Sequence, residues 1–222
     1  MSKELQKYQL DLIEGAMSIG ALKFGSFTLK SGRTSPYFIN AGLLSTGPLI
    51  SAVASGYASL IAKLGIQFDI LFGPAYKGIP FAAATALVLH CDHGIDIGFA
   101  YDRKEAKDHG EGGRMVGSDV KGKRVLILDD VMTAGTAVRQ SIDLIQKEGG
   151  TVAGVVMLLD REEVTVDGNN TVEEIQKILG EGATVNTILR MGDLMLWLEN
   201  NGQVDAVQRM REYRELYGVK KN

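Results

Sequence analysis

Cysteine is almost absent from this sequence. Among 222 residues there is one cysteine, Cys91, which excludes an internal disulfide and suits a reducing compartment. There are four prolines, and no Pro/Ser-rich linker, internal repeat or low-complexity tract divides the chain. These absences predict a single domain over residues 1–222 that depends on an ordinary hydrophobic core.

The chain also lacks a strong excess of charge. Its formal net charge is −3, which gives no general basic field for nucleic acid or for an anionic membrane. The N-terminal segment Met1–Glu4 is polar in character, and we expect no apolar run long enough to cross a bilayer. The sequence therefore predicts a cytoplasmic protein with neither nucleic acid nor membrane as a partner.

The most informative stretch that is present runs from residue 125 to residue 138. Its first four residues are large aliphatics and predict a strand buried on both faces. Asp129 and Asp130 close this strand, and the small residues Thr133–Thr136 then lead into an apolar-periodic helix. Ligands bind at the carboxyl ends of parallel strands, where a helix N-terminus offers N–H groups to an anion. This succession of a strand, two carboxylates, small residues and a helix predicts a site for a phosphate and a ribose diol. A capped helix without a ligand is the alternative.

Strands and helices are expected to alternate along most of the chain. Apolar strands are predicted near residues 68–72, 95–101, 125–128, 152–159 and 185–189. Helices are predicted near residues 3–19, 46–64, 81–88, 138–145, 172–179, 194–198 and 204–217. This alternation predicts an α/β fold with a parallel, doubly wound sheet. Two strands at 27–32 and 35–40 precede it, and with the first helix they are interpreted as a hood over about residues 1–45.

The stretch Arg103–Arg114 has hardly an apolar residue. Because nothing in it favours a packed position, we predict a mobile surface loop at about residues 103–116. Its cations are clustered, with a histidine and flanking glycines, as in loops that close over polyanionic substrates. A solvated hairpin tip is the alternative.

Two other polar clusters are given structural interpretations. His90–His93 has no second Cys/His cluster to complete a zinc site, so it is interpreted as a helix end. Asp160–Glu163 has the composition of an exposed charge run. Only Arg161, directly after a predicted strand, is retained there as a site residue.

Taken together, the segments resemble the orotate phosphoribosyltransferase family over most of the chain. The resemblance is carried by Phe24–Arg33, Ser35–Phe38, Gly73–Pro80, Arg103–Gly112, Asp129–Ala137 and Leu159–Arg161. The Asp129–Ala137 stretch alone resembles the phosphoribosyl diphosphate (PRPP) signature of the type I phosphoribosyltransferases in general. The resemblance implies a type I phosphoribosyltransferase-like α/β fold: a doubly wound, mainly parallel sheet with a small N-terminal hood.

The resemblance also implies an activity. It is the conversion of orotate and PRPP to orotidine 5′-monophosphate and diphosphate, in de novo pyrimidine biosynthesis. It implies Mg²⁺ as cofactor, held mostly by substrate oxygens and water so that no protein ligand is assigned. It further implies a homodimer whose charged loop reaches into the neighbouring site. A phosphoribosyltransferase for a purine or uracil and a PRPP-sensing regulator are the alternatives. The segments around Lys30, Phe38 and Arg161 favour the orotate enzyme over a phosphoribosyltransferase for a purine or uracil.

Individual site residues follow from the same resemblance. Those expected to act in catalysis are Arg103, Lys104, Lys107, His109, Asp129 and Asp130. Those expected to bind substrate are Lys30, Phe38, Ile39, Tyr76, Lys77, Thr133, Ala134, Gly135, Thr136, Ala137 and Arg161. The resemblance implies that the paired aspartates bind the ribose hydroxyls and that Thr133–Ala137 surround the 5′-phosphate. Tyr76 and Lys77 match a pyrophosphate loop that commonly holds a non-proline cis peptide. Many relatives carry a second Phe where this chain has Ile39.

Overall fold

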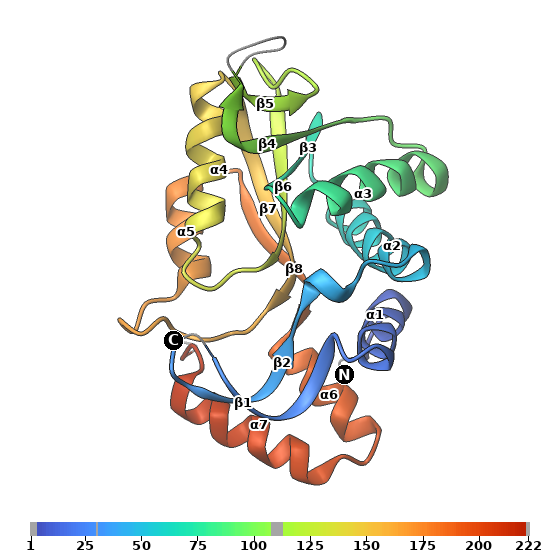
Figure 1. Ribbon diagram of the computed structural model, residues 1–222, viewed down its shortest axis with the longest axis vertical. Helices are drawn as coiled ribbons and strands as arrows, with labels where there is room; N and C mark the ends of the chain where they lie inside the picture. The colour runs from blue at the N-terminus through green and yellow to red at the C-terminus, as the bar shows by residue number, and fades with distance from the viewer. Residues whose placement is uncertain (1–3, 30, 108–112, 221–222) are drawn as a thin grey trace.

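The computed structural model describes residues 4–29, 31–107 and 113–220 of the chain. Figure 1 shows a large central sheet with helices around it and a smaller sheet below. The strands are β1 (Leu22–Thr28), β2 (Thr34–Ile39), β3 (Ile70–Gly73), β4 (Gly98–Lys107), β5 (Gly113–Gly117), β6 (Arg124–Val131), β7 (Thr151–Asp160) and β8 (Thr184–Arg190). The helices are α1 (Lys7–Ser18), the 3-10 turn η1 (Ala41–Leu43), α2 (Gly47–Leu64), α3 (Gly78–His93), α4 (Thr136–Lys147), α5 (Thr171–Leu179), α6 (Met191–Asn200) and α7 (Val204–Tyr217).

The larger sheet has the strand order β5-β4-β3-β6-β7-β8 and is parallel except at the β4–β5 pair. Along β6, Val125 and Ile127 join one hydrophobic core, and Leu126 and Leu128 join a second core on the opposite face. Figure 1 shows α4 and α5 on one side of this sheet and α2 and α3 on the other. The predicted doubly wound, mainly parallel sheet is confirmed, and the run of large aliphatics arises because both faces are buried.

Helix α2 has the predicted bounds because its ends carry strong local signals. Pro48 lies in the first turn, and Gly65 ends the helix with a φ of 61°. By length and composition α2 is the one helix among the described residues that could cross a membrane, with a mean hydropathy of 1.2. The expectation that no apolar run reaches this length is therefore wrong. In this fold Val53, Tyr57 and Ile61 of α2 are buried in the core.

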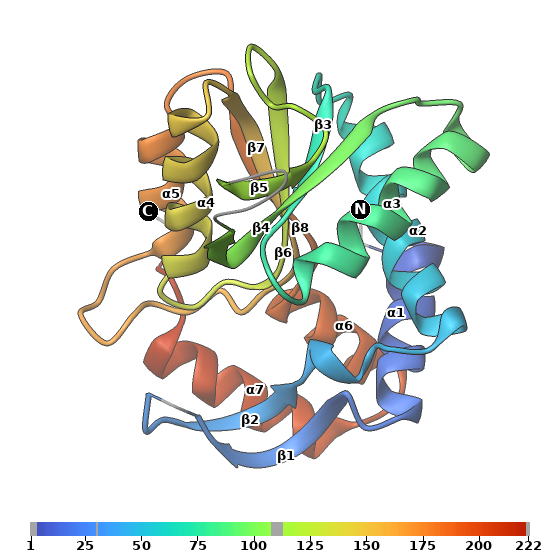
Figure 2. The same cartoon turned by 45° about the horizontal axis from the view of Figure 1, so that its top comes forward.

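The hood is built from both ends of the chain. Strands β1 and β2 pair antiparallel, and α6 and α7 lie beside them in both views (Figures 1 and 2). Phe24 of β1 stacks on Trp197 of α6 with ring centroids 6.4 Å apart. Tyr37 of β2 and Tyr213 of α7 are buried in the same core. The hood expected over residues 1–45 therefore includes helices from the C-terminal part of the chain.

The charged stretch is the largest correction to the expected elements. Residues 103–107 belong to β4 and residues 113–114 to β5, and Lys107 pairs with Gly113. The prediction of a loop is wrong for these residues, which form the arms of a hairpin as in the alternative interpretation, with a register shift between Asp102 and Lys107. Residues 108–112 lie outside the described residues.

A second correction concerns β1, which was expected at residues 27–32. The strand occupies Leu22–Thr28, and the register shifts between Phe24 and Phe27. This irregularity, next to Gly25, breaks the strict alternation that marks a strand in sequence. The helix end at His90–His93 is confirmed, since these residues form the last turn of α3 before Gly94.

Candidate active site

A cavity of about 610 Å³ lies where the carboxyl ends of β6 and β7 meet the hood. It brings together predicted site residues from four separate segments of the chain. Those that line it are Phe38, Ile39, Lys77, Asp130, Thr133, Ala134 and Arg161. This position is the one at which open α/β sheets bind ligands.

One end of the cavity is formed by the turn between β6 and α4. Thr133 and Ala134 are exposed there, and Gly135 precedes the first residue of α4 with a φ of 72°. A Cβ on Gly135 would lie 2.8 Å from Cγ2 of Thr171, so glycine is required for both conformation and space. Thr136 and Ala137 are exposed in the first turn of α4. The unpaired N–H groups of this turn suit a phosphate.

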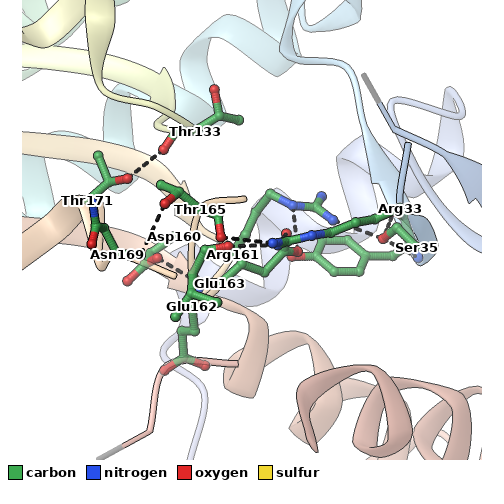
Figure 3. A network of polar contacts seen from close by, with 12 residues as sticks. Arg33, Ser35, Thr133, Asp160, Arg161, Glu162, Glu163, Thr165, Asn169 and Thr171 are labelled. Carbon is green, nitrogen blue, oxygen red and sulfur yellow. Dashed lines mark hydrogen bonds and ion pairs between the residues drawn. The ribbon is translucent and has the colours of Figure 1, made fainter. Parts of the chain in front are cut away.

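Thr171, the first residue of α5, supports this turn from behind. Its hydroxyl donates a hydrogen bond of 2.7 Å to the carbonyl oxygen of Thr133, and its side chain is almost completely buried (Figure 3). Asn170 caps α5 by accepting from the N–H of Val172 at 3.1 Å. Thr171 could not be predicted from the sequence, because its partner lies in a different βα unit. An Asn-Thr pair before a helix signals only a cap.

We predict that Thr171→Val weakens binding of ribose 5-phosphate by about fivefold to tenfold. The substitution keeps the shape but removes the donor that holds the Thr133 carbonyl. Thr171→Ser keeps the donor and should bind as the parent does. Calorimetric titration of both variants with ribose 5-phosphate measures the difference. Equal affinity of the Val and Ser variants contradicts the role of the hydroxyl.

The two carboxylates in the middle of the site differ in their surroundings. Asp130 forms an ion pair with Lys77, which extends from the loop after β3. Burial, together with the charge of Asp130, raises the pKa of the Asp129 carboxyl from 3.8 to about 6. The hydroxyl of Tyr57 donates to the backbone oxygen of Asp129 at 2.6 Å and fixes this end of β6. The pair therefore offers acceptors to a diol in a fixed backbone frame.

The raised pKa of Asp129 makes the stability of the fold depend on pH. Protonation favours the folded state, so this stabilisation is complete below 3.8 and is lost as the pH rises through about 6. Asp129→Asn imitates the protonated carboxyl. Its stability advantage over the parent should grow by about 2 kcal/mol between about pH 4 and about pH 8. Urea unfolding at both pH values tests this, and an advantage that stays constant contradicts it.

The loop from Pro74 to Lys77 carries the residues matched to pyrophosphate. The peptide bond between Ala75 and Tyr76 is cis, as the resemblance implied. The N–H of Ala75 donates to the carboxylate of Asp102 at 2.6 Å. Tyr76 is 71% exposed, and Lys77 is directed to Asp130. The loop therefore presents one aromatic and one cationic side chain near the carboxylates.

The other end of the cavity is formed by the hood and the segment after β7. Arg161 is buried, its Nε donates to Glu163 at 2.8 Å, and its Nη2 donates to the hydroxyl of Ser35 at 2.8 Å. Its guanidinium lies 4.2 Å from the centre of the Tyr37 ring. The interpretation of Asp160–Glu163 as an exposed charge run is wrong, since the Glu163 side chain is 12% exposed. This end combines a fixed cation with Phe38 and Ile39.

The residues predicted on the charged loop are only partly described. Arg103 and Lys104 lie on β4, Lys104 is exposed, and neither lines the cavity. Lys107 is the last residue of β4. Lys30 and His109 lie outside the described residues.

Comparisons with known proteins agree with this geometry. The family described as "Phosphoribosyl transferase domain" matches residues 42–189. Orotate phosphoribosyltransferase of Acinetobacter baumannii (strain ACICU) is 50% identical over 207 residues, which cover 93% of this chain and 94% of the relative. The chain belongs to the orotate phosphoribosyltransferase family.

Two further members of the orotate phosphoribosyltransferase family extend the match. The protein of Aeromonas salmonicida (strain A449) is 48% identical and is covered completely, together with 97% of this chain. The crystal structure of the Francisella tularensis protein has a TM-score of 0.84 and 41% identity over 93% of this chain and 98% of that one. All three relatives are named for the orotate enzyme, not for a purine or uracil enzyme or a regulator.

Proposed function

We propose that this protein catalyses orotate phosphoribosyl transfer. N1 of orotate loses its proton to water or to the pyrophosphate and forms a bond to C1 of the ribose of PRPP, as the bond from C1 to the pyrophosphate oxygen breaks. The products are orotidine 5′-monophosphate and diphosphate, within pyrimidine biosynthesis. The observation that carries the proposal is a cavity lined by Thr133 and Ala134 of the turn before α4 at one end and by Arg161 at the other. The phosphate of one substrate and the anionic base of the other fit these two ends.

The middle of the cavity suits the sugar. We assign Asp129 and Asp130 to the ribose hydroxyls, and Thr133 through Ala137 to the 5′-phosphate. Departure of pyrophosphate leaves positive charge on the sugar ring, and two carboxylates beneath it stabilise that charge. Lys77 forms an ion pair with Asp130, and we assign it to the charge that develops on pyrophosphate.

The base end suits orotate, which is already an anion. Arg161 supplies a fixed positive charge, while Phe38 and Ile39 supply apolar surface on the hood. Ile39 replaces an aromatic side chain with an aliphatic one, so stacking on the pyrimidine falls to Phe38 alone. Lys30 is assigned to the same substrate on the resemblance. Orotate needs no strong base, because its ring nitrogen is acidic.

The charged residues of β4 and the segment after it are assigned to pyrophosphate. Arg103, Lys104, Lys107 and His109 would neutralise the leaving group and cover the site against water, which would otherwise hydrolyse PRPP. Because Arg103 and Lys104 do not line the cavity of their own chain, we propose that the protein is a homodimer and that each segment completes the partner's site. We also propose that the protein is located in the cytoplasm.

Mg²⁺ is the proposed cofactor. Asp129 and Asp130 are the carboxylates assigned to the sugar, and no group of three His, Cys, Asp or Glu side chains among the described residues could hold a metal ion. Two carboxylates fit an ion that is held mainly by the oxygens of the substrate and by water. When bound, the ion neutralises negative charge on the pyrophosphate.

The test is the ultraviolet absorbance of orotate in the presence of the protein, PRPP and Mg²⁺. We expect a PRPP-dependent fall in absorbance with an equal amount of pyrophosphate released. Release of pyrophosphate with adenine, hypoxanthine or uracil but not with orotate contradicts the assignment of the base. Binding of PRPP without turnover of any base contradicts the enzymatic function.

A further inference from the structure

Two arginines share one carboxylate beside the cavity (Figure 3). Nη1 of Arg33 lies 4.0 Å from one carboxylate oxygen of Glu163, and Nε of Arg161 donates to the other at 2.8 Å. The exposed fractions of the three side chains are 14% for Arg33, 12% for Glu163 and 8% for Arg161. Water screens such a group poorly, so its net charge of +1 acts strongly on a nearby ligand.

Arg33 is held in place by groups other than Glu163. Its Nη1 donates to the carbonyl oxygen of Val164 at 2.6 Å, and its Nη2 donates to that of Thr165 at 2.9 Å. Its guanidinium lies 4.6 Å from the centre of the Tyr217 ring. Arg33 comes from the turn between β1 and β2, so the hood delivers this charge to the segment after β7. These contacts fix the position of the charge.

The effect of the Arg33 charge depends on the other charged groups around Arg161 and Glu163. Asp160 lines the cavity, and its carboxylate accepts the N–H of Glu162 at 2.8 Å. Glu162 faces away, toward Arg214 at 3.5 Å and the N–H of Gly192 at 3.0 Å. Without Arg33, the charges of Arg161 and Glu163 would cancel. Because Asp160 adds a further negative charge, the end of the cavity assigned to orotate would then be net negative, whereas with Arg33 the four charges balance.

We propose that Arg33 is a positioning residue that neutralises Glu163 and so leaves the charge of Arg161 available to the carboxylate of the pyrimidine. This inference rests on the proposed function, because it takes an anionic pyrimidine as the ligand. It makes Arg33 and Glu163 determinants of selectivity for an acidic base. Glu163 keeps Arg161 in place through its hydrogen bond, and Arg33 cancels the unfavourable charge that this contact introduces.

Two nucleotides that differ only in the pyrimidine carboxylate test the inference. These are orotidine 5′-monophosphate and uridine 5′-monophosphate, titrated calorimetrically into the parent protein and its variants. Arg33→Met should raise the Kd of orotidine 5′-monophosphate by about tenfold and leave that of uridine 5′-monophosphate within about twofold. The double variant Arg33→Met/Glu163→Gln has the original net charge. It should recover most of the lost affinity for orotidine 5′-monophosphate.

Two further variants separate charge from architecture. Arg33→Lys keeps the charge and should bind orotidine 5′-monophosphate more tightly than Arg33→Met does. Arg124→Met removes a similar arginine, paired with Asp69 at 2.8 Å at the opposite end of β6, and should change neither affinity. Equal weakening of both nucleotides by Arg33→Met, or no recovery in the double variant, overturns the inference. A parent protein that does not turn over orotate overturns the proposed function instead.

Discussion

Replacing Lys107 by alanine should lower kcat for orotate by about a hundredfold to a thousandfold. Lys107 is the last residue of β4, and the proposal assigns it to the departing pyrophosphate. A cation that meets charge developing only in the transition state contributes to turnover more than to binding. The melting temperature should stay close to that of the parent, because a lysine at the end of a hairpin strand adds little to the folded state.

The matched control for this variant is Lys147→Ala. Lys147 is exposed in the last turn of α4, and its removal should leave kcat unchanged. A large fall in the melting temperature of Lys107→Ala contradicts the proposed role, since Lys107 would then be structural. If the segment acts in the partner's site, mixing Lys107→Ala with Lys77→Ala should restore activity in mixed dimers. No recovery in the mixture argues for action within one subunit.

Replacing Gly73 by alanine should damage both folding and catalysis. Gly73 ends β3 and Gly78 begins α3, and the backbones of the two glycines are in direct contact. A Cβ on Gly73 would overlap the carbonyl group of Gly78, so the loop that carries Tyr76 and Lys77 must move. We expect a loss of about 2 to 3 kcal/mol in the free energy of unfolding. Because the pyrophosphate loop is displaced, kcat/KM should fall by at least about a hundredfold.

Gly47→Ala is the control for the added methyl group. A Cβ at Gly47 has open space around it, and Gly47 lies at the start of α2. It should fold and turn over orotate as the parent does. Urea unfolding and steady-state kinetics measure both properties. Normal kinetics in Gly73→Ala would mean that the close approach of the two glycines does not position the loop.

The parts of the fold that sequence analysis predicted are those with local signals. The bounds of α2 follow from Pro48 and Gly65, and the central strand follows from its run of large aliphatics. The charged residues of the β4–β5 hairpin were assigned to a loop, with a hairpin only as the alternative, because a strand without apolar side chains shows no hydrophobic alternation. β1 was displaced because an irregular register hides its alternation.

In the site too, the residues of a local sequence motif were predicted, whereas residues that act through contacts distant in the sequence were not. Asp129, Asp130 and the turn to α4 form one contiguous motif in the sequence, and the structure places Asp130, Thr133 and Ala134 in one cavity with Lys77 and Arg161. Arg33, Glu163 and Thr171 were not singled out, because each acts on a residue far from it in the chain or was assigned to a solvated run. The sequence order of a phosphate-binding turn is informative, whereas the residues that support it are found only in three dimensions.

A hood assembled from both ends of the chain has a consequence for biosynthesis. During translation β1 and β2 leave the ribosome early, but Trp197 and Tyr213, which cover them, are made near the end. The central sheet can pair strand by strand as it emerges, so the phosphate turn should form before the hood is complete. A nascent chain that stops before α7 would lack Tyr213 from the core that contains Tyr37, and Arg33 would lack Tyr217. Such a chain would bind a sugar phosphate while still unable to select its base.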